Sequence, residues 1–537
     1  MGIYRLLLAA FFLMGIVMLA SCGGGSTSAA IQPSPTPTPL PFQNPQLLWA
    51  GDAQVSTVHE DNGVNGTAFS EPAVILLADG TGGAFVVWEA DVEGQVLVQR
   101  IDFNGHRVWS AEVNPAPNSP YMSVAAAALD GAGGIIVAWL DGRAGLCDLT
   151  FKGSCDIYAQ RIDSTGKALW QLDGVPVVTA TENQGTSGIA LVSDGTGGAI
   201  LGWEDARACC TIFAQRIDST GTPVWAIDGV QVSPDPTVVL GGIGAPPQIV
   251  PDGIGGAIVS WWNIQVFPDE QPQTISLQKL NAAGSPMWAS TGVTASLQVM
   301  SPNPSSERRY YQMVSDGAGG VIIAGNQNID NATTTERHVV AQRINTSGTS
   351  IWASGGVRVS NATGPQAYPV LVSNNGGAIA AWRNCTDITF MNCDIAAQKL
   401  DGTGQLLWGP QGIPIVSAPN TQASLSMLAD GSGGAFILWN DCRNFSDANA
   451  CYLNMDIYGQ RLNANGQTLW QPDGFPISAT NGNQGVPYSI EMITPSYAVA
   501  ADGQGGFILS WPDGRHNFCF DPNLSSSCEL FAQRVKP

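Results

Sequence analysis

Apolar and polar positions along this chain alternate between short buried segments and clusters of turn residues. Each repeat opens with Asp-Gly-x-Gly-Gly and continues as an apolar run that ends in Trp, as in DGAGGIIVAW at 130–139. The glycines allow the positive φ angles of a tight turn, and the uninterrupted apolar run predicts a buried strand. Eight such openings occur, at Asp79, Asp130, Asp194, Asp252, Asp316, Asn374, Asp430 and Asp502. Two of them are irregular, because Gly325 replaces the Trp in one and the Asn374 opening is one residue short.

A second predicted strand follows each opening after a loop of variable length and carries Gln followed by Arg or Lys. This pair begins at Gln99, Gln160, Gln215, Gln278, Gln342, Gln398, Gln460 and Gln533. Because a catalytic role would need one special copy, eight equivalent copies indicate a structural task. We expect the Gln amides to form hydrogen bonds between neighbouring sheets.

A turn and another Trp complete each unit except the last, which stops at Pro537, while an additional Trp49 precedes the first unit. The two ends therefore complement each other, as expected if the N-terminal strand completes the final sheet. Four strands in each of eight units predict an all-β fold, an eight-bladed β-propeller of four-stranded blades whose ring is closed in this way. A parallel β-helix, the alternative, predicts shorter repeats and needs no exchange between the termini.

The turn before the second Trp resembles a known motif. The segments DSTGKALW at 163–170, DSTGTPVW at 218–225 and DGTGQLLW at 401–408 resemble the tryptophan-docking motif of eight-bladed quinoprotein propellers, with one residue fewer between Asp and Gly. The resemblance implies that each indole packs against the adjacent blade. The same segments are also similar to the sialidase Asp box, although both spacings differ by one residue. Neither resemblance extends to an active site.

The N-terminus predicts export and a lipid anchor. Arg5, the apolar run 6–19 and the small residues before Cys22 form a signal peptide, and Leu-Ala-Ser-Cys at 19–22 resembles the lipobox of bacterial lipoproteins. The resemblance implies cleavage before Cys22 and its acylation, with an ordinary secretory signal as the alternative. Gly23 stands where that family has its retention Asp, which favours the outer membrane, on its periplasmic or surface side.

These features divide the chain into a lipoprotein signal peptide (1–21), a Gly/Ser/Pro-rich tether (22–45) and the propeller domain (46–537). The acyl chain is the only membrane attachment that the sequence predicts. A formal charge of -21 opposes binding to nucleic acid or to anionic lipid headgroups, so we expect neither as a partner.

Ten further cysteines fall in five close pairs, each in the loop between the two strands described above. In an exported protein this spacing predicts local disulfides, while zinc is the alternative and is opposed by the presence of only four His. The adjacent pair forms either a vicinal disulfide or a shortened clip of the same loop. The predicted pairs are Cys147 with Cys155, Cys209 with Cys210, Cys385 with Cys393, Cys442 with Cys451, and Cys519 with Cys528.

The cysteine-containing loops and the connections between blades are predicted to lie on one face of the ring. Four blades carry Trp-x-Asp-x-Arg there, which predicts either a local ion pair or a broken ring of charges that binds a glycan or a carboxylated ligand. The candidate ligand-binding residues are Asp141, Arg143, Asp205, Arg207, Asp441, Arg443, Asp513 and Arg515. An Arg in this motif has a further possible partner in the acidic residue that opens the next strand, such as Asp156, Asp456 or Glu529.

No G-x-S-x-G, HExxH, Walker or calcium-loop motif occurs in the sequence. We therefore expect no catalytic residue, no metal and no cofactor, and interpret the chain as a monomeric binding or scaffolding module for a glycan or protein partner. A quinone-dependent oxidoreductase and a glycan hydrolase are the alternatives, because propeller active sites are assembled from several blades.

Overall fold

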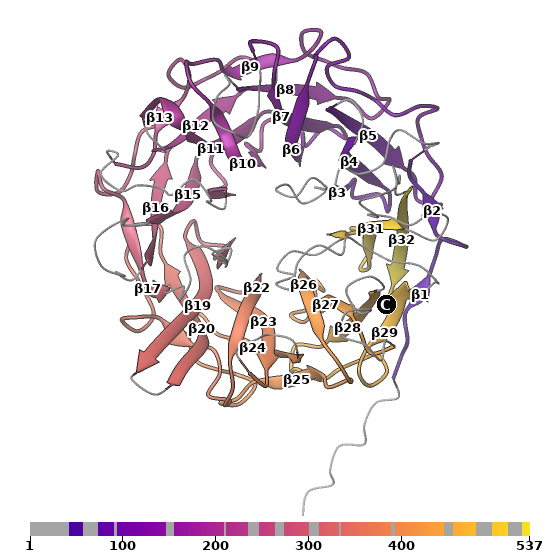
Figure 1. Ribbon diagram of the computed structural model, residues 1–537, viewed down its shortest axis with the longest axis vertical. Coiled ribbons are helices and arrows are strands. Elements are labelled where there is room, and N and C mark those ends of the chain that lie inside the picture. Colours follow the sequence, from indigo (N-terminus) through magenta and orange to yellow (C-terminus); the bar gives the residue numbers. More distant parts are fainter. Residues whose placement is uncertain are drawn as a thin grey trace, which may run out of the picture. The chain divides into compact units, whose positions relative to one another are not determined.

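The computed structural model is a ring of eight antiparallel sheets, which confirms the predicted eight-bladed β-propeller (Figure 1). The compact unit begins at Phe42, and its described part contains one helical segment, the short η1 (Ala206–Ala208). No helix of this part is long and apolar enough to cross a membrane. The structure describes residues 42–56, 74–90, 94–145, 155–208, 211–234, 246–263, 273–299, 311–331, 334–387, 392–444, 455–478, 497–513 and 529–537.

Each blade is an antiparallel meander in which the first strand lies nearest the ring axis and the last lies at the rim (Figure 1). Blades 1 to 4 are β3 (Ile75–Ala78), β4 (Ala84–Ala90) and β5 (Gln95–Ile101); β6 (Met122–Leu129), β7 (Ile135–Asp141), β8 (Asp156–Ile162) and β9 (Val175–Val178); β10 (Gln184–Ser193), β11 (Ala199–Asp205), β12 (Thr211–Ile217) and β13 (Val230–Gln231); β14 (Gln248–Pro251), β15 (Ala257–Asn263), β16 (Gln273–Leu280) and β17 (Val293–Val299). In blade 1 an isolated bridge between Val98 and Val113 takes the place of the fourth strand.

The remaining blades follow the same plan. Blades 5 to 8 are β18 (Tyr311–Ser315), β19 (Val321–Asn331), β20 (Thr334–Ile344) and β21 (Val357–Arg358); β22 (Gln366–Asn374), β23 (Gly377–Cys385), β24 (Cys393–Leu400) and β25 (Ile413–Val416); β26 (Gln422–Ala429), β27 (Ala435–Asp441), β28 (Asp456–Leu462) and β29 (Phe475–Ser478); β30 (Ala498–Ala501), β31 (Phe507–Asp513) and β32 (Glu529–Lys536), completed by β1 (Gln46–Leu47) and β2 (Ala53–Gln54).

The N-terminal strands close the ring, as the complementary ends predict. Both β1 and β2 pair antiparallel with β32, the third strand of blade 8. Trp49 donates its backbone N–H to Oε1 of Gln533 and accepts a hydrogen bond from its Nε2, at 2.9 Å each. Closure removes the exposed strand edge that an open array would leave.

The Asp-Gly-x-Gly-Gly turns are stabilised by hydrogen bonds within the turn. Asp130 Oδ1 accepts hydrogen bonds from the backbone N–H groups of Ala132 (2.8 Å) and Gly134 (2.7 Å), while Gly131 and Gly133 have φ angles of 72° and 89°. Only glycine adopts such angles without a steric cost. The turn delivers β7 directly into the core, where all seven of its residues are buried.

The repeated Gln residues are structural, but the expectation that they connect neighbouring sheets is wrong. Gln160 Oε1 accepts from the backbone N–H groups of Arg161 and Trp170, at 3.0 Å each, and its Nε2 donates to the carbonyl of Gln171 at 2.9 Å. All three partners belong to the same blade. The fourth strand leaves the hydrogen-bond ladder near Trp170 and rejoins it as β9. Between these points the Gln160 amide forms the hydrogen bonds that the ladder lacks, so that buried backbone polar groups are paired.

Contacts between neighbouring blades come instead from the Trp and the Arg of each unit. In blade 1, Trp109 Nε1 and Arg100 Nη1 both donate to the carbonyl oxygen of Ser164 in blade 2, at 3.2 Å each. The indole lies against Gly166 of the same turn, where an added Cβ would come within 3.1 Å of the ring. Six further indoles donate to a turn carbonyl of the next blade in the same way, those of Trp49, Trp170, Trp225, Trp288, Trp352 and Trp408.

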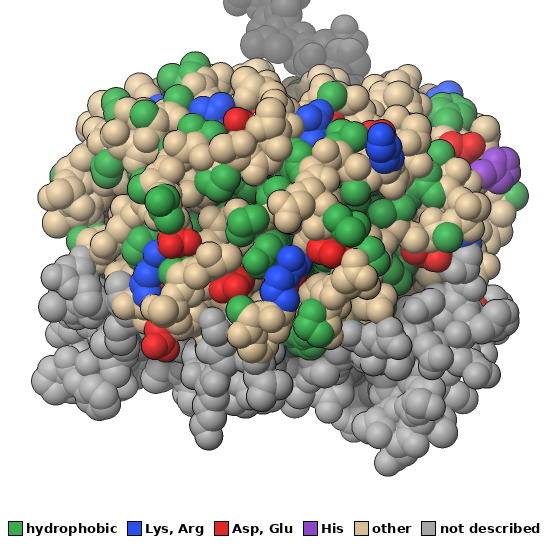
Figure 2. Space-filling model, turned by 90° about the horizontal axis from the view of Figure 1, so that it is seen from above, with side chains coloured by type: hydrophobic (Ala, Val, Ile, Leu, Met, Phe, Trp, Pro, Cys, Tyr) green, Lys and Arg blue, Asp and Glu red, His purple; other side chains and the backbone are tan. Residues whose placement is uncertain are grey.

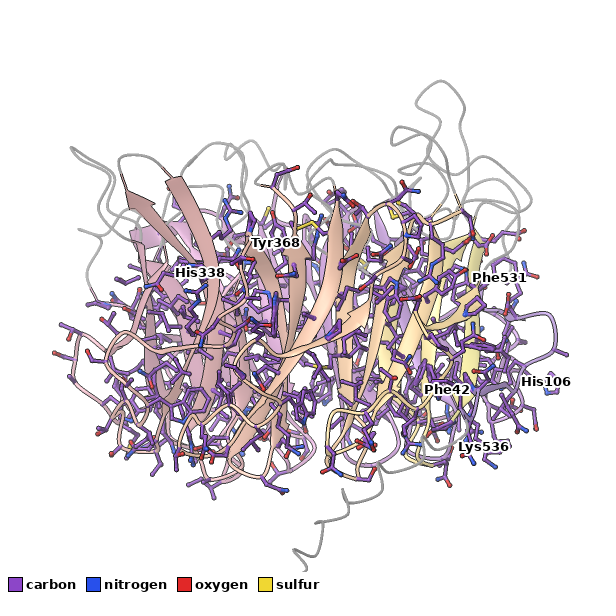
Figure 3. All side chains as sticks on the ribbon, turned by 90° about the horizontal axis from the view of Figure 1, so that it is seen from below. Phe42, His106, His338, Tyr368, Phe531 and Lys536 are labelled. Atoms are coloured by element: carbon purple, nitrogen blue, oxygen red, sulfur yellow. A yellow bond between two sulfur atoms is a disulfide. The ribbon has the colours of Figure 1, made fainter. Side chains whose placement is uncertain are left out.

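The ring has two different faces. We call "turn face" the one that carries the Asp-Gly-x-Gly-Gly turns and the turns between third and fourth strands. We call "loop face" the opposite one, which carries the connections between second and third strands and those between blades. Figure 3 shows the ring edge-on, with Phe42 and Lys536 toward the turn face.

Candidate functional site on the loop face

The Trp-x-Asp-x-Arg segments leave their blades on the loop face, and in blade 2 they form a buried ion pair. Asp141 is fully buried, and its carboxylate accepts hydrogen bonds from Arg143 Nε (2.8 Å) and Nη2 (2.7 Å), Trp139 Nε1 (2.8 Å) and Ser119 Oγ (3.0 Å). Burial alone would raise the pKa of Asp141, but the hydrogen bonds from Arg143 and Trp139 hold it below its ordinary value. This geometry is that of the local ion pair.

Arg143 then connects the second strand with the rim of the blade. Its guanidinium lies over the ring of Tyr158, with the central carbon 3.8 Å from the ring centroid, and Nη2 donates to the carbonyl oxygen of Asp173 at 2.7 Å. The Arg143 side chain keeps 27% of its surface exposed, while Asp141 keeps none. A ligand on the loop face would therefore meet the guanidinium and not the carboxylate. Figure 2 shows Lys and Arg side chains beside Asp and Glu side chains at several places on the surface.

The same arrangement recurs in the other three blades that carry the motif, as far as the structure describes them. In blade 3, Asp205 accepts from Trp203 Nε1 (2.9 Å) and pairs with Arg207 (2.8 Å). In blade 7 the corresponding Asp441 binds Trp439 (2.6 Å) and Arg443 (2.6 Å). In blade 8, Asp513 accepts from Trp511 Nε1 at 2.8 Å, and Arg515 lies outside the described residues. Whether a ligand contacts these eight residues stays a prediction.

A second carboxylate, not among the predicted site residues, completes the unit in blades 2, 3 and 7. Asp173 has a left-handed φ of 62°, and its Oδ1 accepts the backbone N–H of Asn118, in the connection that enters the blade, at 3.0 Å. Asp228 and Asp473 bind the entering connections of blades 3 and 7 in the same way, at 3.0 Å from the N–H groups of Thr179 and Ser417. We call the set Trp139, Asp141, Arg143 and Asp173, with its counterparts, the "linker clamp".

A signal for the linker clamp exists in the sequence. The pattern Trp-x-x-Asp at the rim occurs only in blades 2, 3, 7 and 8, beginning at Trp170, Trp225, Trp470 and Trp49. These are the same four blades that carry Trp-x-Asp-x-Arg. In blades 2, 3 and 7 the coincidence reflects contact, because the Arg of one pattern donates to the main-chain carbonyl of the Asp in the other.

Asp156 opens the third strand of blade 2 and directly faces Asp141 across the ladder. Burial, the negative charge of Asp141 and that of Asp228 in the next blade raise its pKa to about 6, although the nearby Arg143 acts in the opposite direction. The corresponding Asp456 also has a raised pKa, chiefly through burial, and accepts a hydrogen bond from Asn444 Nδ2 at 2.7 Å. The loops between the second and third strands of blades 2 and 7 therefore have a buried carboxylate at each end.

One predicted disulfide is confirmed in full. Cys385 and Cys393 are directly opposite each other across β23 and β24 and are bonded to each other at the start and end of their loop. Cys155 and Cys442 are also disulfide-bonded. Their predicted partners Cys147 and Cys451 lie outside the described residues, as do Cys209, Cys210, Cys519, Cys528 and the predicted lipidation site Cys22.

The remaining blades lack the linker clamp. In blade 1 Ala90 takes the place of the carboxylate, and the buried Trp88 Nε1 has no hydrogen-bond partner within the described part of the chain. Blade 6 has Asn384 at this position, and the buried Trp382 Nε1 is also without a partner there. Blade 5 instead extends its central hairpin, because β19 and β20 each run for 11 residues. Among the described residues, no group of three His, Cys, Asp or Glu side chains could hold a metal ion.

Comparisons with known proteins assign no family to the chain. No family model and no curated protein matches the sequence. Among solved structures, an ulvan lyase is 11% identical over 79% of this chain and 97% of its own, with a TM-score of 0.41. A lectin from Burkholderia pseudomallei is 12% identical over 77% and 100%, with a TM-score of 0.41. A europium-containing methanol dehydrogenase is 12% identical over 91% and 93%, with a TM-score of 0.38.

Proposed function

We propose that this chain is a cell-envelope lipoprotein whose propeller is a binding or scaffolding module, with a glycan or protein partner held on the loop face. In this proposal the signal peptide is cleaved before Cys22 and acylation of that residue anchors the protein, preferentially in the outer membrane. No catalytic step is assigned to it.

The observation that carries the proposal is the division of labour between the two faces. The repeated residues, such as the Gln amide, the indole and the turn Asp, make their contacts within the blade or with the next blade. They are therefore structural and do not offer their polar groups to a ligand. The loops vary, yet the linker clamp and the disulfide between Cys385 and Cys393 fix the points where they leave the sheets. Variable loops on a rigid repetitive scaffold are the usual location of recognition.

The binding role can be tested with a panel of soluble glycans, calcium and pyrroloquinoline quinone in thermal unfolding. A ligand at 100 times its dissociation constant stabilises the folded state by about 2.7 kcal/mol, so a true ligand raises the melting temperature. For any ligand found, hydrogen exchange shows which face it covers. Protection of amides in 142–145 and 442–444 supports the proposal, whereas protection confined to the turns 163–167 and 218–222 contradicts it.

Two outcomes would replace the binding module by an enzyme. Stabilisation by quinone with calcium, accompanied by reduction of a dye, would establish an oxidoreductase. Release of new reducing ends from a glycan that binds, without an unsaturated sugar product, would establish a hydrolase. The anchor is tested separately, by incorporation of labelled palmitate into the parent protein and its loss in Cys22→Ala.

A further inference from the structure

The ring holds the N-terminal chain at the turn face. Gln43 donates its backbone N–H to the carbonyl oxygen of Leu469 at 3.0 Å, and Asn44 exchanges two hydrogen bonds with Gln471 at 3.1 Å each. Leu469 directly follows the turn between the third and fourth strands of blade 7. The position of the chain is therefore fixed on the turn face from its first described residues.

From there the chain runs toward the loop face. Gln46 in β1 pairs with Lys536 at the end of β32, while Gln54 in β2 pairs with Phe531, near its beginning. Because β32 runs from the loop face to the turn face, the antiparallel N-terminal segment enters at the turn face. Figure 3 agrees, since Phe42 and Lys536 lie toward one side of the ring and Phe531 toward the other.

The predicted tether would join the lipid anchor to the ring at this entry point, which bears on the face that is turned to the membrane. Cys22 and Phe42 are 20 positions apart; a flexible chain of the length of residues 22–31 has a root-mean-square extent of about 17 Å, and the Pro-rich residues 32–41 add about 31 Å if they extend as polyproline II. A seven-residue strand such as β7 spans about 23 Å, so the loop face stands a full strand length beyond the entry point. The loop face would face an anchoring membrane only if the tether folded back along the rim over that strand length.

Two large apolar side chains are exposed in turns of the turn face. Ile254 is 79% exposed at the tip of the opening turn of blade 4, and Phe103 is 52% exposed in the turn between third and fourth strands of blade 1. Half-buried carboxylates of such turns, for example Asp102 and Asp163, lie on the same face and repel anionic headgroups.

We infer that the turn face is the surface apposed to the bilayer, and that the loop face is presented away from it. The partner of the turn face is a membrane of zwitterionic lipid, approached through the anchor. This inference rests on the proposed acylation of Cys22, and its experiment separates a failure of the anchor from a failure of the orientation.

The experiment uses the purified, full-length mature protein on phosphatidylcholine vesicles that contain headgroup-spin-labelled lipid. Two variants, Ile254→Cys on the turn face and Ala144→Cys on the loop face, carry the same thiol-reactive dye. Both positions are exposed, so neither change disturbs the core. The parent protein with no added cysteine, treated with the same dye, gives the background labelling.

We expect the spin label to remove most of the emission from the dye at position 254 and little of the emission at position 144. Equal quenching at the two positions, or stronger quenching at 144, overturns the inference while leaving the anchor intact. If the parent protein carries no acyl chain and does not float with vesicles, the anchor is wrong and the inference falls with it. Flotation of the parent but not of Cys22→Ala establishes that the anchor is in place for the comparison.

Discussion

The linker clamp of blade 2 makes Asp141→Asn an informative substitution. It keeps the shape of the side chain but removes the charge that Arg143 binds through two hydrogen bonds. It also places an N–H group where donors from Trp139 and Ser119 already point. The variant therefore loses an ion pair and gains a buried clash of donors.

The size of the effect follows from burial. Removing one partner of a buried ion pair costs about 3 to 5 kcal/mol, because the other charge is left without compensation. Arg143 is 27% exposed and can turn partly into water, so we expect a cost of about 3 kcal/mol, near the lower end of that range. For a ring of roughly 490 residues the unfolding entropy is about 1 kcal/mol/K, which makes this about 3 °C in melting temperature.

Differential scanning calorimetry of Asp141→Asn, Arg143→Gln and the double variant measures the effect and its coupling. A coupling energy of about 1 to 3 kcal/mol is expected for groups in direct contact. Asp205→Asn is the matched variant in blade 3, where the same ion pair exists, and should melt lower by a similar amount. An unchanged melting temperature in Asp141→Asn together with a loss of ligand binding would refute the structural role and identify the residue as part of a ligand site.

Three further outcomes follow from the structure. Gly221→Ala should lower the free energy of unfolding by about 2 to 4 kcal/mol, because φ is 87° and the new Cβ would lie 2.9 Å from an indole of the preceding blade. Gly195→Ala, where φ is 76° and the added Cβ meets no neighbour, should lower it by only about 1 kcal/mol. Chemical denaturation of the two variants measures the difference. Asp156→Asn should stabilise the protein by about 3 kcal/mol at pH 8, because the pKa of Asp156 is about 6 in the folded state and near 3.8 in the unfolded state. This gain in stability should fade as the pH falls from 6 to 4. A stability difference between variant and parent that does not depend on pH would contradict the raised pKa. Replacement of Cys385 and Cys393 by alanine should cost about 2.5 kcal/mol relative to the oxidised parent protein, and reduction of the parent, which also breaks the disulfides of Cys155 and Cys442, should cost more.

The sequence predicts the fold well because the fold is periodic. The blades repeat the same kind of turn, the same buried run and the same pair of Gln with Arg or Lys, so an error in one unit is corrected by the others. The two exceptions, Gly325 and Asn374, still fall at the expected places in β19 and at the end of β22. The ring closure is predictable for a similar reason, since the strand missing after Pro537 is found around Trp49.

The site is less predictable, because its two local patterns, Trp-x-Asp-x-Arg and Trp-x-x-Asp, do not by themselves show that their residues meet. The partner of the repeated Gln is its own fourth strand, which leaves the ladder and then rejoins it, and the sequence does not show where this occurs. The same excursion brings Asp173 to Arg143 and creates the linker clamp. The raised pKa of Asp156 depends on burial and on Asp228 of a neighbouring blade, which only the assembled ring brings close.

Closure by the N-terminal strand has a consequence for biosynthesis. The hydrogen bonds between Trp49 and Gln533 join residues 484 positions apart, so the first strand to be synthesised must wait for almost the last. Until the N-terminal strands pair with β32, the rim of blade 8 is an open strand edge, which can accept a strand from a nearby chain. Two copies that fold side by side can exchange their N-terminal strands at this stage, and a high rate of synthesis should therefore favour swapped dimers over singly closed rings.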